Sequence, residues 1–190
     1  MKKWENNMWK FIKSSTSQEN WLDVSNHEIV FWGRSNVGKS SLINALAKTK
    51  LAKTSSTPGR TRLINYFETT NHQIVVDLPG YGYASMSKKD QQKVNGIIDH
   101  YFRNSEISKT VCFLIDAKVG FTPIDLEMID YINFLGISFD IIITKIDKAN
   151  QSQKHRVKTQ ALTFKKEINI FLVSSEKNLG LEDLNEYYKF

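Results

Sequence analysis

The sequence predicts an α/β fold whose sheet is mostly parallel and carries helices on both faces. Residues 28–32 form a short apolar run, followed by a glycine-rich loop and a helical pattern that reaches about residue 48. From residue 110 onward, apolar strand-like runs alternate with segments whose apolar residues recur at helical spacing. Such alternation favours a parallel sheet buried on both sides. The 190 residues contain no internal repeat or linker, so we expect one main domain.

The first 27 residues allow two interpretations. Their aromatic and aliphatic residues from Trp4 to Ile12 recur at helical spacing, whereas 8–12 alone also fits a short strand. In either case we expect the aromatic side chains to pack on the domain. The sequence therefore predicts an N-terminal extension at 1–27 that packs on a domain at 28–190.

The other elements follow in chain order. Residues 49–62 are polar and include Pro58 and Gly59, which favours an irregular loop. Strand patterns at 63–69 and 72–77 are separated by two residues, which predicts an antiparallel hairpin. Further strands are expected at 110–116, 139–144 and 168–173, and helices at 88–103, 122–135, 152–165 and 181–189. The resulting sheet has six strands, with one antiparallel edge strand.

Composition limits the environment and the partners. The chain has one cysteine, Cys112, so no disulfide can form within it, and the apolar run around this residue indicates a core position. Neither a membrane span nor a secretory signal is recognisable, which favours a cytoplasmic protein without stable membrane insertion. A net charge of +6 and a pI of about 9.3 suit RNA, an anionic membrane surface, or simply a basic surface.

The loop at 33–40 has the form G-x-x-x-x-G-K-[ST], which is typical of a phosphate-binding loop. Its glycines let the backbone approach phosphate closely, and successive N–H groups then form an anion-binding nest. The lysine reaches the terminal phosphates and the last hydroxyl can ligate Mg²⁺. The expected phosphate-binding residues are Gly33, Arg34, Ser35, Asn36, Val37, Gly38, Lys39 and Ser40.

Three further motifs follow predicted strands. Asp77, Leu78, Pro79 and Gly80 fit a Mg²⁺-binding carboxylate and an N–H for a γ-phosphate, although a strand-ending turn has the same composition. Thr144, Lys145, Ile146 and Asp147 place a carboxylate that can accept two hydrogen bonds from guanine and none from adenine. Val173, Ser174 and Ser175 can offer backbone N–H groups to guanine O6. Because parallel strands end at one rim of a sheet, we expect all these motifs to meet there.

Taken in order, these motifs resemble the EngB family of bacterial GTPases, within the Era-like group. The resemblance runs from about residue 11 to the C-terminus and implies a P-loop NTPase fold of the Ras-like G-domain type. It implies Mg²⁺ ligands at Ser40 and Thr61, and a switch I segment that comprises Gly59, Arg60, Thr61, Arg62 and Leu63. It also implies a monomer that acts on the large ribosomal subunit precursor and rRNA, with a family link to cell division and septum formation. One departure is Glu176-Lys177 after the serine pair, which weakens any role for Lys177.

The implied reaction is hydrolysis of GTP to GDP and phosphate, assisted by Lys39, Thr61, Gly80 and Asn36. Tyr81 occupies the position where many GTPases have a water-orienting glutamine, so we expect a slow intrinsic rate. By the same resemblance, Asn36 either holds K⁺ with carbonyl groups of 57–59 or only stabilises the loop. A P-loop kinase is disfavoured because Asp147 selects a base, and a membrane-associated division protein is the remaining alternative.

Overall fold

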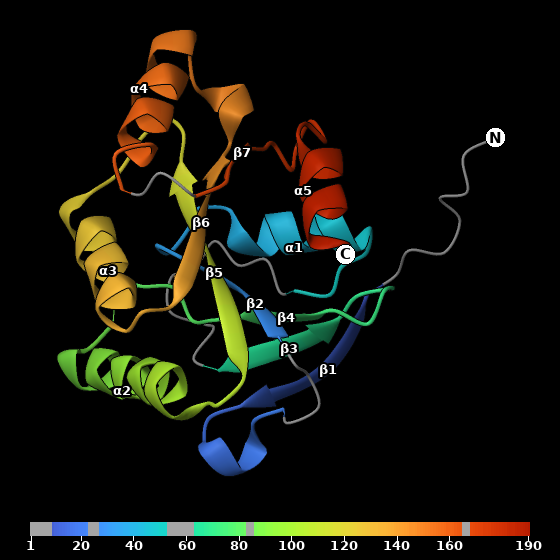
Figure 1. Cartoon of the computed structure of the whole chain (residues 1–190), viewed down its shortest axis with the longest axis vertical. Coiled ribbons are helices and arrows are strands. Elements are labelled where there is room, and N and C mark those ends of the chain that lie inside the picture. Colours follow the sequence, from blue (N-terminus) through green and yellow to red (C-terminus); the bar gives the residue numbers. More distant parts are fainter. Residues whose placement is uncertain (1–8, 23–26, 53–62, 83–85, 165–167) are drawn as a thin grey trace.

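Seven strands form one mixed sheet in the computed structural model, which describes residues 9–22, 27–52, 63–82, 86–164 and 168–190. Their order across the sheet is β1-β3-β4-β2-β5-β6-β7 (Figure 1). The strands are β1 (Lys10–Ser15), β2 (His27–Gly33), β3 (Ile64–Glu68), β4 (Ile74–Asp77), β5 (Ser108–Asp116), β6 (Ser138–Thr144) and β7 (Ile170–Leu172). The α-helices are α1 (Lys39–Ala47), α2 (Lys88–Asn104), α3 (Pro123–Phe134), α4 (Gln151–Ala161) and α5 (Leu181–Tyr188).

The predicted α/β class, with a mostly parallel sheet and helices on both faces, is confirmed, while the strand count is corrected from six to seven. Strands β4, β2, β5, β6 and β7 are parallel to one another, and β3 forms the predicted antiparallel hairpin with β4. The additional strand is β1, so β3 is an interior strand and not the antiparallel edge.

Among the described residues of the N-terminal segment, Lys10–Ser15 form a strand and not a helix. It pairs antiparallel with β3 from Lys10 opposite Glu68 to Ser15 opposite Ile64, with a bulge at Ile12. The pairing satisfies the backbone groups along β3 that an open edge would leave without partners. Strand β1 therefore lies in the same sheet as the domain, and the boundary between 1–27 and 28–190 stays a prediction.

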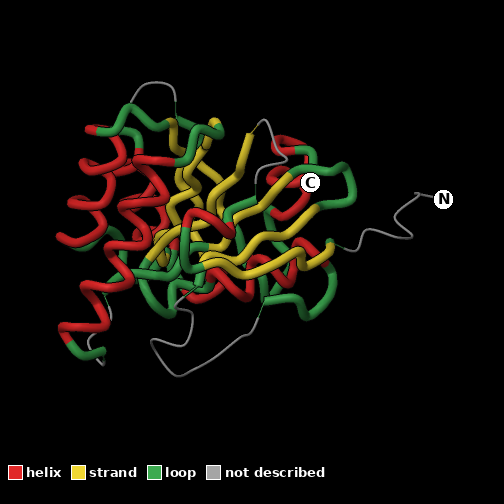
Figure 2. Tube along the Cα trace, turned by 90° about the horizontal axis from the view of Figure 1, so that it is seen from below, coloured by secondary structure: helices red, strands yellow, loops and turns green. Residues whose placement is uncertain are grey.

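Alternating side chains of β2 enter two separate cores. Val30 and Trp32 pack toward α2, α3 and α4, whereas Ile29 and Phe31 pack toward α1 and α5. Figure 2 shows the helices on both sides of the strands. This alternation is what a strand covered on both faces requires: α2, α3 and α4 cover one face of the sheet, and α1 and α5 cover the other.

The core beneath α5 contains Cys112, which is fully buried as expected. Its Sγ donates to the Tyr188 hydroxyl at 3.2 Å, and that hydroxyl donates to Asp140 Oδ2 at 2.5 Å. Burial raises the pKa of the Cys112 thiol well above its ordinary value. The thiol is thus a neutral packing group on β5.

Candidate functional site

The phosphate loop connects β2 to α1 in a shape that needs its two glycines. A Cβ on Gly33 would lie 2.8 Å from the Leu114 carbonyl oxygen, because β2 and β5 are adjacent there. Gly38 has φ +107° and caps α1, which begins at Lys39. Asn36 also has positive φ, at 64°. The loop therefore turns tightly into the N-terminus of a helix, where N–H groups and the helix dipole favour an anion.

Lys39 and Asp77 lie together at this helix N-terminus. Both side chains are buried and form an ion pair, and Asn65 Nδ2 donates to the other Asp77 oxygen at 3.3 Å. Asp77 ends β4, whose neighbour in the sheet is β2. The structure thus brings the predicted carboxylate to the phosphate loop, although the two motifs are 38 residues apart.

The residues near the loop fit a magnesium ion that is shared with phosphate. No cluster of three or more metal-binding side chains occurs in the described ranges. Mg²⁺ on a nucleotide needs none, because phosphates and water supply most of its oxygen ligands. Ser40, in the first turn of α1, and the Asp77 carboxylate are the matching donors in the described chain. The other predicted ligand, Thr61, lies outside the described residues, as do Gly59, Arg60 and Arg62.

The motif at 144–147 is tied directly to the phosphate loop. The Thr144 hydroxyl donates to the Val37 carbonyl at 2.7 Å, and Lys145 Nζ donates to the Asn36 carbonyl at 2.7 Å. Lys145 Nζ also pairs with Asp116 Oδ2 at 2.9 Å. Burial tends to raise the pKa of Asp116, but the hydrogen bonds from Lys145 and from the next backbone N–H groups lower it below its ordinary value. Asp116 is therefore an ionised anchor for Lys145.

Asp147 lies at the same rim with an exposed carboxylate. The Ser174 hydroxyl lowers the pKa of Asp147, so the side chain is an ionised acceptor. The Ile146 N–H donates to the Val173 carbonyl at 3.3 Å, which joins the 144–147 and 173–175 motifs. Ser174 is buried and bridges Leu179 through backbone hydrogen bonds at 3.0 Å in both directions. The predicted base-recognition residues are thus adjacent in space.

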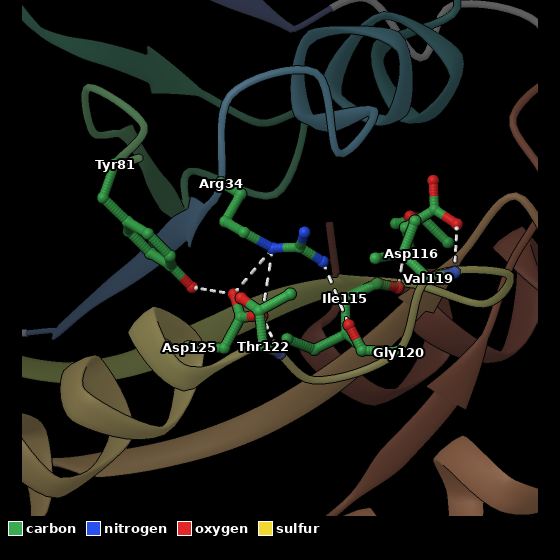
Figure 3. Close-up of polar contacts among 9 residues, drawn as sticks. Arg34, Tyr81, Ile115, Asp116, Val119, Gly120, Thr122 and Asp125 are labelled. Carbon is green, nitrogen blue, oxygen red and sulfur yellow. Dashed lines mark hydrogen bonds and ion pairs between the residues drawn. The ribbon is translucent and has the colours of Figure 1, made fainter. Parts of the chain in front are cut away.

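Two predicted residues lie differently from the rest. The Arg34 side chain turns away from the loop, so only its backbone can serve a phosphate: Nε donates to Asp125 Oδ1 at 3.0 Å and a terminal nitrogen to the Gly120 carbonyl at 3.0 Å (Figure 3). Leu63 is half-exposed next to the segment that the structure leaves undescribed. The individual roles of the predicted site residues stay predictions.

Sequence reasoning missed Asp125, whose carboxylate is fully buried. Besides Arg34, it accepts hydrogen bonds from the Tyr81 hydroxyl at 2.9 Å and from the Thr122 N–H and hydroxyl at 2.7 Å each (Figure 3). The available signal was Thr-x-x-Asp before an apolar stripe, a capping box at the start of α3. That signal predicts a helix start, but not a contact with the phosphate loop.

Comparison with known proteins agrees with this geometry. Residues 28–145 match the model of a family described as 50S ribosome-binding GTPase. The chain is 74% identical over 182 residues to the probable GTP-binding protein EngB of Metamycoplasma arthritidis, which covers 96% of this chain and 100% of the relative. The chain belongs to the EngB family of GTP-binding proteins. A relative in Aquifex aeolicus is 42% identical over 83% of this chain and 86% of its own length.

Solved structures support the same fold for this EngB-family member. A crystal structure of a probable GTP-binding protein engB is 26% identical, has a TM-score of 0.65, and covers 84% of this chain and 95% of its own. Era in complex with MgGDPNP and nucleotides 1506–1542 of 16S ribosomal RNA is 24% identical with a TM-score of 0.68, over 86% of this chain and 56% of Era. At that identity the likeness to Era shows the G-domain fold alone. As a GTPase of the EngB family, the chain binds GTP and hydrolyses it.

Proposed function

We propose that this EngB-family GTPase is a GTP-dependent switch in assembly of the large ribosomal subunit. The observation that carries the proposal is the match of 28–145 to a ribosome-binding GTPase model, over the segment that contains the phosphate loop and Asp77. We expect the protein to act as a cytoplasmic monomer on the subunit precursor and its rRNA, with the family link to cell division and septum formation. Within the described ranges, no helix has the length and apolar character to cross a membrane.

The residues of the site have complementary roles in this proposal. The amides of 33–40 and Lys39 hold the phosphates, and Gly80 offers its N–H to the γ-phosphate. Ser40, Thr61 and Asp77 would hold Mg²⁺, which supplies charge neutralisation on the β- and γ-oxygens. Asp147 reads guanine. Loss of the γ-phosphate then releases Thr61 and Gly80, which is the usual way in which GTP hydrolysis becomes a conformational signal.

Positive charge on α4 supports RNA as the partner. The helix carries Lys154, Arg156 and Lys158 and no acidic residue, and only Val157 and Ala161 of it are buried. A helix with this charge attracts phosphate independently of the nucleotide sequence. Across the sheet, exposed Lys10 on β1 adds to the net charge of +6.

Co-sedimentation tests this function. We expect binding to large subunits in preference to small subunits, stronger with a non-hydrolysable GTP analogue than with GDP, and steeply weaker as salt rises. Replacement of Lys154, Arg156 and Lys158 by glutamate should weaken pelleting and leave nucleotide affinity unchanged. Equal pelleting with both subunits, indifferent to nucleotide, would contradict the proposal, and pelleting with anionic liposomes alone would favour the membrane alternative.

Potassium is the second element of the proposal. Asn36 lies exposed in the phosphate loop, and its backbone carbonyl accepts a hydrogen bond from Lys145, which leaves the side chain available. Asn36 would hold K⁺ together with carbonyls of 57–59, adding positive charge where the absent glutamine gives no help. Hydrolysis should be faster in KCl than in matched NaCl, and Asn36→Ala should abolish the difference with little change in GDP affinity. Equal wild-type rates in the two salts, alone and with ribosomes, would eliminate this role.

A further inference from the structure

The backbone ladder between β4 and β2 contains one extra residue next to the phosphate loop. The Leu78 N–H donates to the Phe31 carbonyl at 3.2 Å, and the next bond of the ladder runs from the Tyr81 N–H to the Gly33 carbonyl at 3.2 Å. Two residues of β2 are therefore spanned by three residues of the partner segment, which is the defining feature of a bulge. The bulge carries Pro79 and Gly80 out of the ladder, at the point where Gly80 must meet a γ-phosphate.

Both sides of this bulge are anchored by buried side chains. Trp32 Nε1 donates to the Pro79 carbonyl at 3.1 Å, and the Trp32 ring meets the Tyr81 ring edge-on with 5.2 Å between centroids. The Ser35 N–H donates to the Tyr81 carbonyl at 2.9 Å, so the residue after Gly80 is bonded to the phosphate loop through both of its backbone groups. The remaining freedom of Tyr81 lies in its side chain.

Asp125 fixes the Tyr81 side chain and connects it to Arg34 of the phosphate loop. One oxygen of its carboxylate receives the Tyr81 hydroxyl and Arg34 Nε, and the other receives the two donors of Thr122 (Figure 3). Burial, with Asp125 beside it, raises the pKa of Tyr81, so the hydroxyl stays protonated at neutral pH and donates its hydrogen bond. Asp125 therefore joins three segments: the phosphate loop, the turn that follows β4 and contains Tyr81, and the N-terminus of α3.

We propose that Asp125 is a positioning residue that, through Tyr81 and Arg34, holds the Gly80 amide where it meets the γ-phosphate. The inference deepens the proposed GTP switch and rests on it. A γ-phosphate is present in GTP and absent from GDP, so a displaced Gly80 amide weakens GTP binding selectively. A side chain that only supported the fold would change the affinity for both nucleotides or for neither.

The experiment compares Tyr81→Phe with Tyr131→Phe. Tyr131→Phe is the control for loss of a tyrosine hydroxyl, because the Tyr131 hydroxyl also donates to a carboxylate, that of Asp99 at 2.7 Å, in a partly buried contact between α2 and α3. Affinities for GDP and for a non-hydrolysable GTP analogue are measured by calorimetry in Mg²⁺, with thermal unfolding followed in parallel. We expect Tyr81→Phe to lower the affinity for the GTP analogue about three- to tenfold, which is the usual effect of one buried hydrogen bond. The affinity for GDP should fall by less than about twofold. Tyr131→Phe should leave the ratio of the two affinities unchanged.

Two substitutions at the carboxylate complete the test. Asp125→Asn should change the ratio in the same direction and by more, because it also leaves Arg34 without its counter-charge. Thr122→Val removes a hydrogen bond from the same carboxylate without touching residue 81, so it should lower the melting temperature and keep the wild-type ratio. If the folded Tyr81→Phe protein keeps the wild-type ratio of GTP-analogue to GDP affinity, or loses affinity for both nucleotides equally, the positioning role of Asp125 is wrong. The proposed GTP switch is then unaffected. If the wild-type protein does not bind the GTP analogue, both proposals fail.

Discussion

At the scale of single residues, we expect base selection to depend on the exposed carboxylate of Asp147. The Ser174 hydroxyl keeps it ionised, so it can accept two hydrogen bonds from guanine. Asp147→Asn should lower the affinity for GTP by about two orders of magnitude or more. The variant should instead bind xanthosine triphosphate, whose 2-oxo group accepts a hydrogen bond from the amide. Titration calorimetry with both nucleotides measures the exchange. Unchanged GTP affinity in the variant would rule out the assignment of the base.

The second prediction at this scale concerns how the stability of the fold depends on pH through Glu28. Its carboxylate is buried at the start of β2, where the Tyr101 hydroxyl donates to it at 2.5 Å. Burial raises the pKa of Glu28, although Tyr101 and nearby Lys109 oppose the change. The folded chain thus holds this proton more tightly than the unfolded chain, and the stabilisation is present below the unfolded value of 4.5 and lost as pH rises through the folded value.

Replacement by glutamine isolates this effect. Glu28→Gln should become progressively more stable relative to the wild type as pH rises above 4.5, and the difference should level off above the folded pKa. Urea unfolding at closely spaced pH values measures both proteins. A difference that does not vary with pH would show that Glu28 keeps its ordinary pKa in the folded chain.

At the scale of elements, two glycines should respond in opposite ways to the same substitution. Gly180 caps α5 with φ +68°, and a Cβ there would lie 2.0 Å from the Leu172 carbonyl oxygen. Gly180→Ala should therefore destabilise the fold by about 1–3 kcal/mol or more. Gly96 is exposed in α2 with no atom within 4 Å of an added Cβ, so Gly96→Ala should stabilise by about 0.5–1 kcal/mol. Chemical denaturation distinguishes the two signs directly.

Most elements could be predicted from sequence because their signals are local. The phosphate loop and the alternation after residue 110 depend on glycine positions and apolar spacing, and both were confirmed. Strand β1 could not be settled, since its apolar residues fit two periods and the partner strand begins some 50 residues later. Asp125 was missed for a related reason. Its contact with Arg34 joins residues 91 positions apart, and no local pattern encodes such a pairing.

At the scale of the whole molecule, the last residue, Phe190, packs with Trp9, the first described residue, in the core between the sheet, α1 and α5. Its ring lies 5.1 Å from that of Trp9, 6.0 Å from that of Phe31 and 5.3 Å from that of Tyr188. Phe190→Ala should destabilise the fold by about 3 kcal/mol, as for other large buried side chains. Phe134→Ala is the control, because this side chain is 79% exposed and its loss should cost within about 0.5 kcal/mol. Similar melting temperatures for the two variants would contradict the assignment of Phe190 to the core.

The reactivity of the buried Cys112 thiol should report nucleotide binding without any added label. Because the side chain is sealed beneath Tyr188 and the chain has no other cysteine, an alkylating reagent can react only when this core opens. A nucleotide that binds the closed form reduces the open population by the factor 1 + [L]/Kd, so the alkylation rate should fall about 100-fold at 100 times Kd. Mass spectrometry of the unmodified protein would follow this protection for GDP and for a GTP analogue without any introduced label. Rapid alkylation that nucleotide does not slow would mean that α5 detaches from the sheet independently of the nucleotide site.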